Sequence, residues 1–147
     1  MADEGQVIYW DASAILSLLL ADEHSEIAAD WVRKADTHLI STLAHSETCA
    51  VIARLEKEGH LSSGLAKEAL QALKDGPWRR LNAWPDWDQS IALSRRRPLR
   101  GADLWHLATS AKLQTEIPEL TLLTFDAKLH QAALGERLAS HDFLNGA

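Results

Sequence analysis

The chain has 147 residues, 46% of them apolar, and a net charge of −6 at neutral pH. This length and composition predict one folded domain over residues 1–147 and exclude a wholly disordered chain. No apolar stretch is long enough to cross a membrane, the start of the chain is too acidic for a secretory signal, and a single cysteine, Cys49, excludes an internal disulfide. We therefore expect a cytoplasmic protein without membrane contact.

Hydrophobic periodicity predicts short strands that alternate with helices. Gly59 marks the end of one helix, and Asp75-Gly76-Pro77 and Pro98 end two others. In chain order, the predicted elements are a strand over 6–10, helices over 14–20 and 25–35, a strand over 38–42, helices over 46–58 and 63–74, a weaker strand over 78–82, helices over 85–94 and 103–113, a strand over 120–124 and a helix over 127–134. The tail from Leu138 is predicted to be a last short strand or irregular.

This alternation indicates βαβ units. Such units build a parallel sheet with helices on both faces. The expected fold class is therefore α/β, a three-layer α/β/α sandwich around a short, mainly parallel central sheet. No internal repeat, low-complexity tract or linker interrupts the chain, which agrees with one domain.

Four acidic residues stand at the edges of apolar elements. Asp11 follows the first strand and Asp126 follows the last, while Asp103 opens a helix. Glu47 lies near the start of another helix. Ligands of an open parallel sheet bind beyond the carboxyl ends of its strands, so acids at these positions are expected to converge. Clustered carboxylates repel one another unless a cation is bound, and the pattern therefore predicts a site for a divalent cation.

Each acid also has a simpler explanation when it is taken alone. Asp11 and Asp126 could be helix N-caps only. Asp103 could belong to a helix start, where the helix dipole is expected to lower the pKa of its carboxyl group and keep it ionised. Glu47 could be a solvated charge. Four acids at one end of one predicted sheet favour the cation site over four separate coincidences.

The segments around these acids resemble a known family of nucleases. They are Tyr9-Trp10-Asp11-Ala12-Ser13-Ala14, His45-Ser46-Glu47-Thr48, Ala102-Asp103-Leu104-Trp105-His106-Leu107-Ala108 and Leu123-Thr124-Phe125-Asp126. In this order and at these separations they resemble the PIN-domain nucleases, above all the toxin ribonucleases of bacterial VapBC-type toxin–antitoxin pairs. Trp105 stands where that family often has a smaller apolar residue, which leaves the four acids unaffected.

The resemblance implies an endoribonuclease that depends on Mg²⁺ or Mn²⁺. Its catalytic and metal-binding residues would be Asp11, Glu47, Asp103 and Asp126, with Ser13 and Thr124 as small hydroxyl residues that support them. One or two ions would activate a water molecule and offset the charge that builds up on the phosphate. The implied partners are the RNA substrate, a cognate antitoxin with a basic inhibitory segment, and a second copy of the chain in a homodimer.

Basic and aromatic residues give weaker indications. The cluster of Arg95, Arg96, Arg97 and Arg100 would contact the RNA backbone near Asp103, or else form a solvated helix end. His106 could touch the site, but a core histidine or one that supports the site from behind is favoured. The closely spaced residues Trp78, Trp84 and Trp87 would be exposed, for base stacking or for a protein partner. The segment Leu16–Leu20 and the face around Trp31 would leave apolar surface for the antitoxin.

Rival functions remain at this point. A response-regulator receiver or a haloacid-dehalogenase-like phosphatase also places an Asp after its first strand. The phosphatase needs a second Asp where this chain has Ser13, and the receiver needs a Lys after a late strand, so both are disfavoured. A PIN-like module that binds without turnover, and a nuclease that processes RNA outside a toxin pair, stay open.

Overall fold

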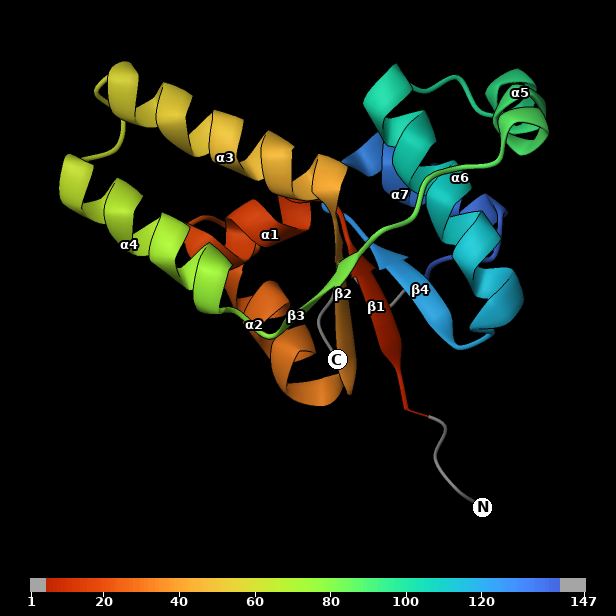
Figure 1. Ribbon diagram of the computed structural model, residues 1–147, viewed down its shortest axis with the longest axis horizontal. Helices are drawn as coiled ribbons and strands as arrows, with labels where there is room; N and C mark the ends of the chain where they lie inside the picture. The colour runs from red at the N-terminus through yellow and green to blue at the C-terminus, as the bar shows by residue number, and fades with distance from the viewer. Residues whose placement is uncertain (1–4, 141–147) are drawn as a thin grey trace.

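A four-stranded parallel sheet runs through the centre of the computed structural model, which describes residues 5–140 (Figure 1). The strands are β1 (Val7–Trp10), β2 (Thr37–Ser41), β3 (Trp78–Leu81) and β4 (Leu120–Leu123), in the spatial order β3-β2-β1-β4. Each neighbouring pair of strands is parallel, so the predicted parallel sheet is confirmed.

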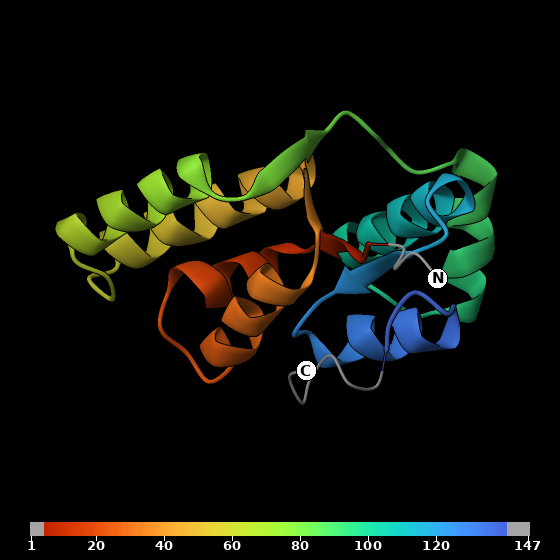
Figure 2. The ribbon, with the colours of Figure 1, turned by 90° about the horizontal axis from the view of Figure 1, so that it is seen from below.

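Helices cover both faces of this sheet. Their bounds are α1 (Ala12–Leu19), α2 (Ser25–Lys34), α3 (Thr42–Lys57), α4 (Ser63–Asp75), α5 (Trp87–Arg96), α6 (Gly101–Glu116) and α7 (Ala127–Gly135). Helices α1 to α4 lie on one side of the sheet and α5 to α7 on the other, as Figure 2 shows. The expected three-layer α/β/α sandwich is therefore the observed fold.

Successive side chains of the central strand β1 enter two different cores. Tyr9 packs with Leu107 of α6 on one face of the sheet. Trp10 packs on the opposite face with Ile15 of α1 and Trp31 of α2. Because successive side chains of a strand point to opposite faces, a strand that helices cover on both sides is apolar throughout. This explains why β1 shows a continuous apolar run rather than an alternating pattern.

The register of the sheet brings several strand ends to one edge. Trp10, at the end of β1, pairs with Ile40 of β2 on one side and with Leu123 of β4 on the other. The backbone N–H of Asp11 then donates to the carbonyl of Leu123 at 3.2 Å, which extends the contact between β1 and β4 by one more bond. The residues that follow these strands therefore leave the sheet together, and this edge carries the candidate site.

The type of each predicted element is confirmed, while several bounds are wrong. The helix expected over 46–58 begins at Thr42, because the Ser41 hydroxyl accepts a hydrogen bond from the Ala44 N–H at 3.1 Å and starts the helix directly at the end of β2. Glu47 therefore lies in the second turn of α3. The helix expected over 85–94 is α5, which begins and ends two residues later than predicted. The helix expected over 103–113 is α6, which is longer than predicted at both ends.

Apolar surface lies elsewhere than expected. Trp31 is only 4% exposed, and Leu16 and Leu19 pack against a small core between α3 and α4, so the expectation of a free apolar face around Trp31 is wrong. Among residues 5–140, the large apolar side chains that are exposed are Leu65, Leu70, Trp84, Trp87 and Ile91. Trp78, which was expected to be exposed, is half-buried against Trp10, with their ring centroids 5.2 Å apart.

Three further expectations from the sequence concern the tail, membrane spans and the number of domains. The predicted tail from Leu138 lies largely outside the described residues, although the Leu138 carbonyl accepts a hydrogen bond from the Leu122 N–H at 2.6 Å. Between residues 5 and 140, no helix combines the length and the apolar character that a membrane span requires. That residues 1–147 form a single domain stays a prediction.

Candidate active site

Asp11 is the most deeply buried of the four acids, with 4% of its surface exposed. It is the N-cap of α1, where its Oδ1 accepts hydrogen bonds from the Ala14 N–H at 2.9 Å and from the Ser13 hydroxyl at 2.7 Å. Its Oδ2 accepts a short hydrogen bond from the Thr124 hydroxyl. Burial raises the pKa of the Asp11 carboxyl, and the three hydrogen bonds only partly oppose that shift.

The hydroxyl groups of Ser13 and Thr124 join the start of α1 to the connection between β4 and α7. The Ser13 oxygen accepts a hydrogen bond from the Phe125 N–H at 2.9 Å, and the Thr124 oxygen accepts one from the Asp126 N–H at 3.1 Å. Each hydroxyl therefore donates to Asp11 and accepts from the backbone beside Asp126. Both residues therefore contact the Asp11 carboxyl, and their role as polar supports of a metal site stays a prediction.

Asp103 and Asp126 line a common cavity of about 520 Å³, together with Arg100 and Lys128. Asp103 lies in the first turn of α6, and Asp126 is the N-cap of α7, where it accepts a hydrogen bond from the Leu129 N–H at 3.0 Å. Asp126 is exposed, and Asp103 is half-buried. The N-cap explanation therefore holds for Asp11 and Asp126, yet it does not account for the carboxyl of Asp103 beside them.

The pKa of Asp103 shifts in the direction opposite to the expected one. Burial raises the pKa of this carboxyl most, and the negative charges of Asp126 and Glu47 raise it further. His106 and Arg100 act in the other direction without reversing the shift. The expectation that the helix dipole keeps the pKa low is therefore wrong, because burial and neighbouring acids outweigh the helix start.

Glu47 reaches the site from α3 and contacts a buried histidine. Its Oε1 lies 2.7 Å from Nε2 of His106, whose side chain is 1% exposed, whereas that of Glu47 is 32% exposed. On the other side of the imidazole ring, Nδ1 lies 2.7 Å from the hydroxyl of Tyr9. His106 is therefore a buried histidine that contacts both Tyr9 and Glu47.

The donor chemistry of the four acids fits a hard divalent cation, although their present orientations do not enclose one. Within residues 5–140, no group of three His, Cys, Asp or Glu side chains is arranged to hold a metal ion. The Asp11 carboxylate accepts hydrogen bonds from the Ser13 and Thr124 hydroxyls, and Oε1 of Glu47 contacts His106. All the donors are carboxylate oxygens, which Mg²⁺ and Mn²⁺ prefer, and the mutual repulsion of Asp103 and Asp126 is the kind that a cation relieves.

The arginines expected to contact RNA divide into two groups. Arg96 and Arg97 both form ion pairs with Glu136, each at 2.9 Å, and so tie the end of α5 to the end of α7. Arg95 is exposed at the end of α5, away from the lining of the Asp103 cavity. Arg100 alone of the four lines that cavity. Lys128, which sequence reasoning missed, lines it as well; its place two residues after Asp126 was the available signal.

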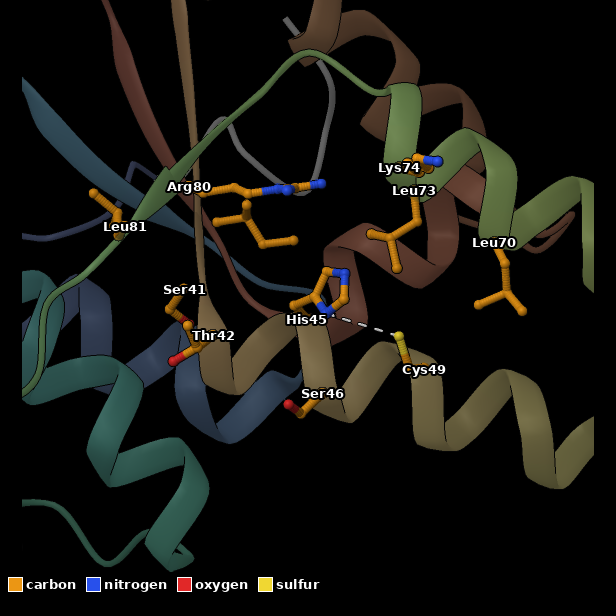
Figure 3. Close-up of a pocket in the computed structure, with 11 residues that line it drawn as sticks. Ser41, Thr42, His45, Ser46, Cys49, Leu70, Leu73, Lys74, Arg80 and Leu81 are labelled. Atoms are coloured by element: carbon orange, nitrogen blue, oxygen red, sulfur yellow. Dashed lines mark hydrogen bonds between the residues drawn. The ribbon is translucent and has the colours of Figure 1, made fainter.

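A second cavity, of about 550 Å³, lies beyond the ends of β2 and β3 (Figure 3). Apolar side chains such as Leu73 and Leu81 line it together with the cations Lys74 and Arg80. The His45 ring occupies one wall, with its Nδ1 3.8 Å from the sulfur of Cys49 on the next turn of α3 (Figure 3). None of the four acids is among its described lining residues, so this cavity is a neighbour of the acidic site and not a part of it.

Comparison with known proteins decides the family. The sequence profile of the PIN domain matches residues 8–134, a span that contains all four acids. The chain belongs to the PIN-domain family. Two relatives are Ribonuclease VapC45 of Mycobacterium tuberculosis (strain CDC 1551 / Oshkosh) and Ribonuclease VapC49 of Mycobacterium tuberculosis (strain ATCC 25618 / H37Rv). Each is 30% identical to this PIN-domain protein over 130 residues, which cover 86% of this chain and 89% of the relative.

Solved structures agree with the PIN fold. PAE2754 from Pyrobaculum aerophilum matches with a TM-score of 0.61 and 19% identity, over 90% of this chain and 85% of that one. VapC20 of Mycobacterium tuberculosis, a toxin that cleaves the sarcin–ricin loop, matches with a TM-score of 0.58 and 16% identity, over 85% of this chain and 94% of that one. At these identities the likeness concerns the fold alone, and it agrees with the three-layer sandwich described above.

Proposed function

We propose that this PIN-domain protein is a metal-dependent endoribonuclease, the toxin of a type II toxin–antitoxin pair, which hydrolyses RNA phosphodiester bonds. The observation that carries the proposal is the match to proteins named as VapC ribonucleases over most of both chains. The grouping of Asp11, Glu47, Asp103 and Asp126 at one sheet edge supports it, because phosphodiester hydrolysis at a carboxylate site needs several acids around a cation.

The metal ligands in this proposal are the four carboxylates, with Mg²⁺ or Mn²⁺ as the cofactor. When bound, such an ion lowers the pKa of a water molecule and offsets charge on the phosphate. The hydroxyls of Ser13 and Thr124 hold the Asp11 carboxylate in one orientation, so that its position does not depend on the ion. The acids Asp103 and Asp126 approach from two different helix starts, which leaves their cavity open to a substrate.

The RNA backbone is expected to enter the cavity that Asp103 and Asp126 line. Arg100 and Lys128 stand on its wall and supply two positive charges for phosphate groups. Arg96 and Arg97 are engaged with Glu136, so we assign them to the fold rather than to RNA. The arginines that we propose as RNA contacts are therefore fewer than the four predicted from the sequence.

The proposed protein partners are a cognate antitoxin and a second copy of the chain, in the cytoplasm. A basic antitoxin segment would complement the acidic site. Self-association is supported by the exposed apolar side chains Trp84, Trp87 and Ile91, which are 58%, 87% and 62% exposed. Light scattering of the purified protein measures whether it is a dimer.

RNA cleavage with and without divalent cation tests the proposed function. Purified protein should cleave cellular RNA in Mg²⁺ or Mn²⁺, should stop in excess chelator, and should lose at least about 100-fold in rate as Asp126→Asn. Expression of the wild type alone should arrest growth, and coexpression of the neighbouring reading frame should restore it. Cleavage without growth arrest would indicate an RNA-processing nuclease outside a toxin pair. Cation binding without cleavage would indicate a binding module.

A further inference from the structure

His106 lies directly behind Glu47, and we propose that it is a positioning residue that holds the Glu47 carboxylate in place for the cation. The proposal deepens the proposed function, since it requires that Glu47 serves the metal site. It concerns a chain of two hydrogen bonds that runs from Tyr9 through His106 to Glu47, which we call the Tyr9–His106 relay.

The geometry of the relay leaves the imidazole ring little freedom. His106 is 1% exposed, and both of its ring nitrogens are engaged at 2.7 Å, Nδ1 with Tyr9 and Nε2 with Glu47. The rings of Tyr9 and His106 also meet edge to face, with centroids 5.7 Å apart. A buried ring with two short hydrogen bonds on opposite sides cannot rotate without losing both of them.

The direction of each hydrogen bond follows from the Tyr9 end. The Tyr9 side chain is fully buried, and a tyrosine phenol keeps its proton at neutral pH. Tyr9 therefore keeps its proton and donates it to Nδ1, which leaves the imidazole proton on Nε2, pointed at Glu47.

This arrangement suits a carboxylate that must stay available for a cation. A Glu side chain with free rotamers loses conformational entropy when it is fixed, and a preformed hydrogen bond reduces the part of that cost that falls on cation binding. The bond to His106 occupies Oε1 and does not involve Oε2. Asp103 lies one turn before His106 on α6, so a single helix carries one acid of the site and the support of another.

The relay also ties α3 to the rest of the molecule. Tyr9 belongs to β1, His106 belongs to α6, and Glu47 belongs to α3. Partners of this kind, which orient a metal ligand without touching the metal, typically contribute about 10- to 100-fold to metal affinity or activity. The sequence alone did not decide the role of His106, because its partners Tyr9 and Glu47 are far from it along the chain.

Mn²⁺ affinity, measured by calorimetry on the full-length protein, tests the proposal. His106→Leu should weaken Mn²⁺ binding and lower kcat by about 10- to 100-fold, with the KM for RNA nearly unchanged. His106→Gln, which keeps an N–H donor for Glu47, should recover part of the loss, and Tyr9→Phe should show a smaller loss in the same direction. In a Glu47→Gln background, His106→Leu should cost no further Mn²⁺ affinity. An equal loss in both backgrounds, or no loss in either, would overturn the proposal.

A matched control and a spectroscopic measurement separate positioning from folding. His38 is also buried, with Nδ1 accepting a hydrogen bond from the indole Nε1–H of Trp10 at 3.1 Å and Nε2 at 3.2 Å from the Val32 carbonyl, but it contacts none of the four acids. His38→Leu should lower the melting temperature without changing Mn²⁺ affinity. Imidazole ¹⁵N shifts of the metal-free protein should show His106 with its proton on Nε2. A proton on Nδ1 instead would overturn the relay even if RNA cleavage were established, and the expected shifts would support the relay even if cleavage failed.

Discussion

Replacement of Asp11 by Asn should affect stability and activity in opposite directions. The carboxyl is 4% exposed, and its pKa is raised by burial despite hydrogen bonds from Ser13, Ala14 and Thr124. A raised pKa means that the folded state resists the ionised form. Asn is as good an N-cap as Asp and retains an oxygen for the Ala14 N–H, so the variant keeps the start of α1 while it loses the buried charge.

The expected gain in stability reflects two opposing effects of the substitution. Hydrogen bonds to an ionised group are roughly twice as strong as neutral ones, so the three bonds to Asp11 weaken in the variant. The raised pKa shows that the cost of burying the charge exceeds the stabilisation by these bonds. We expect Asp11→Asn to stabilise the metal-free protein by on the order of 1 kcal/mol, the size of a typical single-substitution effect, or about 3 °C in melting temperature.

Thermal unfolding in chelator, followed by circular dichroism across pH, measures this effect. Because the folded-state pKa of Asp11 lies above its unfolded value, the wild type regains stability as pH falls through the folded-state pKa, and the advantage of the variant should vanish near the unfolded value. Asp86→Asn is a matched control, an exposed N-cap that accepts the Gln89 N–H, and should change little. A wild type that is clearly more stable than Asp11→Asn at pH 7 in chelator would refute the reasoning.

Three further predictions concern the surroundings of the acids. Thr124→Val keeps the side-chain volume but leaves an Asp11 oxygen and the Asp126 N–H without their partner, so urea unfolding should show a loss of about 2 kcal/mol. Glu136→Gln should lower the melting temperature by no more than about 3 °C at neutral pH, and the difference should disappear as pH falls through the depressed folded-state pKa of Glu136. Arg100→Ala and Lys128→Ala should each raise KM for RNA several-fold with kcat unchanged. Each should also reduce the slope of the logarithm of RNA affinity against the logarithm of salt concentration by about one. Arg96→Ala should change neither the KM nor this slope.

The fold could be predicted from the sequence because its main signals are local. The apolar run before Asp11 indicated β1, and alternation of strands with helices indicated the parallel sheet and its three layers. Helix starts were less predictable, since the Ser41 cap competes with several polar residues that follow it. The burial of Trp31 depends on how α2 packs against α1, which no local pattern records.

The candidate site was predictable in position but not in its electrostatics. The order of the strands explains why acids after β1 and β4 meet at one edge. The raised pKa of Asp103 depends on burial and on Asp126, which lies on a different helix, so the helix-start argument alone predicted the wrong sign. The contact of His106 with Tyr9 likewise joins residues 97 positions apart. Such long-range contacts follow from the packing of α6 on the sheet.

The central claim is that the four acids form one cation site, and anomalous scattering from Mn²⁺-soaked crystals tests it most directly. The account predicts a Mn²⁺ peak at the sheet edge, with carboxylate oxygens of Asp11, Asp103 and Asp126 within coordination distance and Glu47 bound directly or through water. Asp103→Asn crystals under the same soak should show a much weaker peak. A saturating soak that leaves this edge without a peak, or that places Mn²⁺ on other residues, would contradict the account.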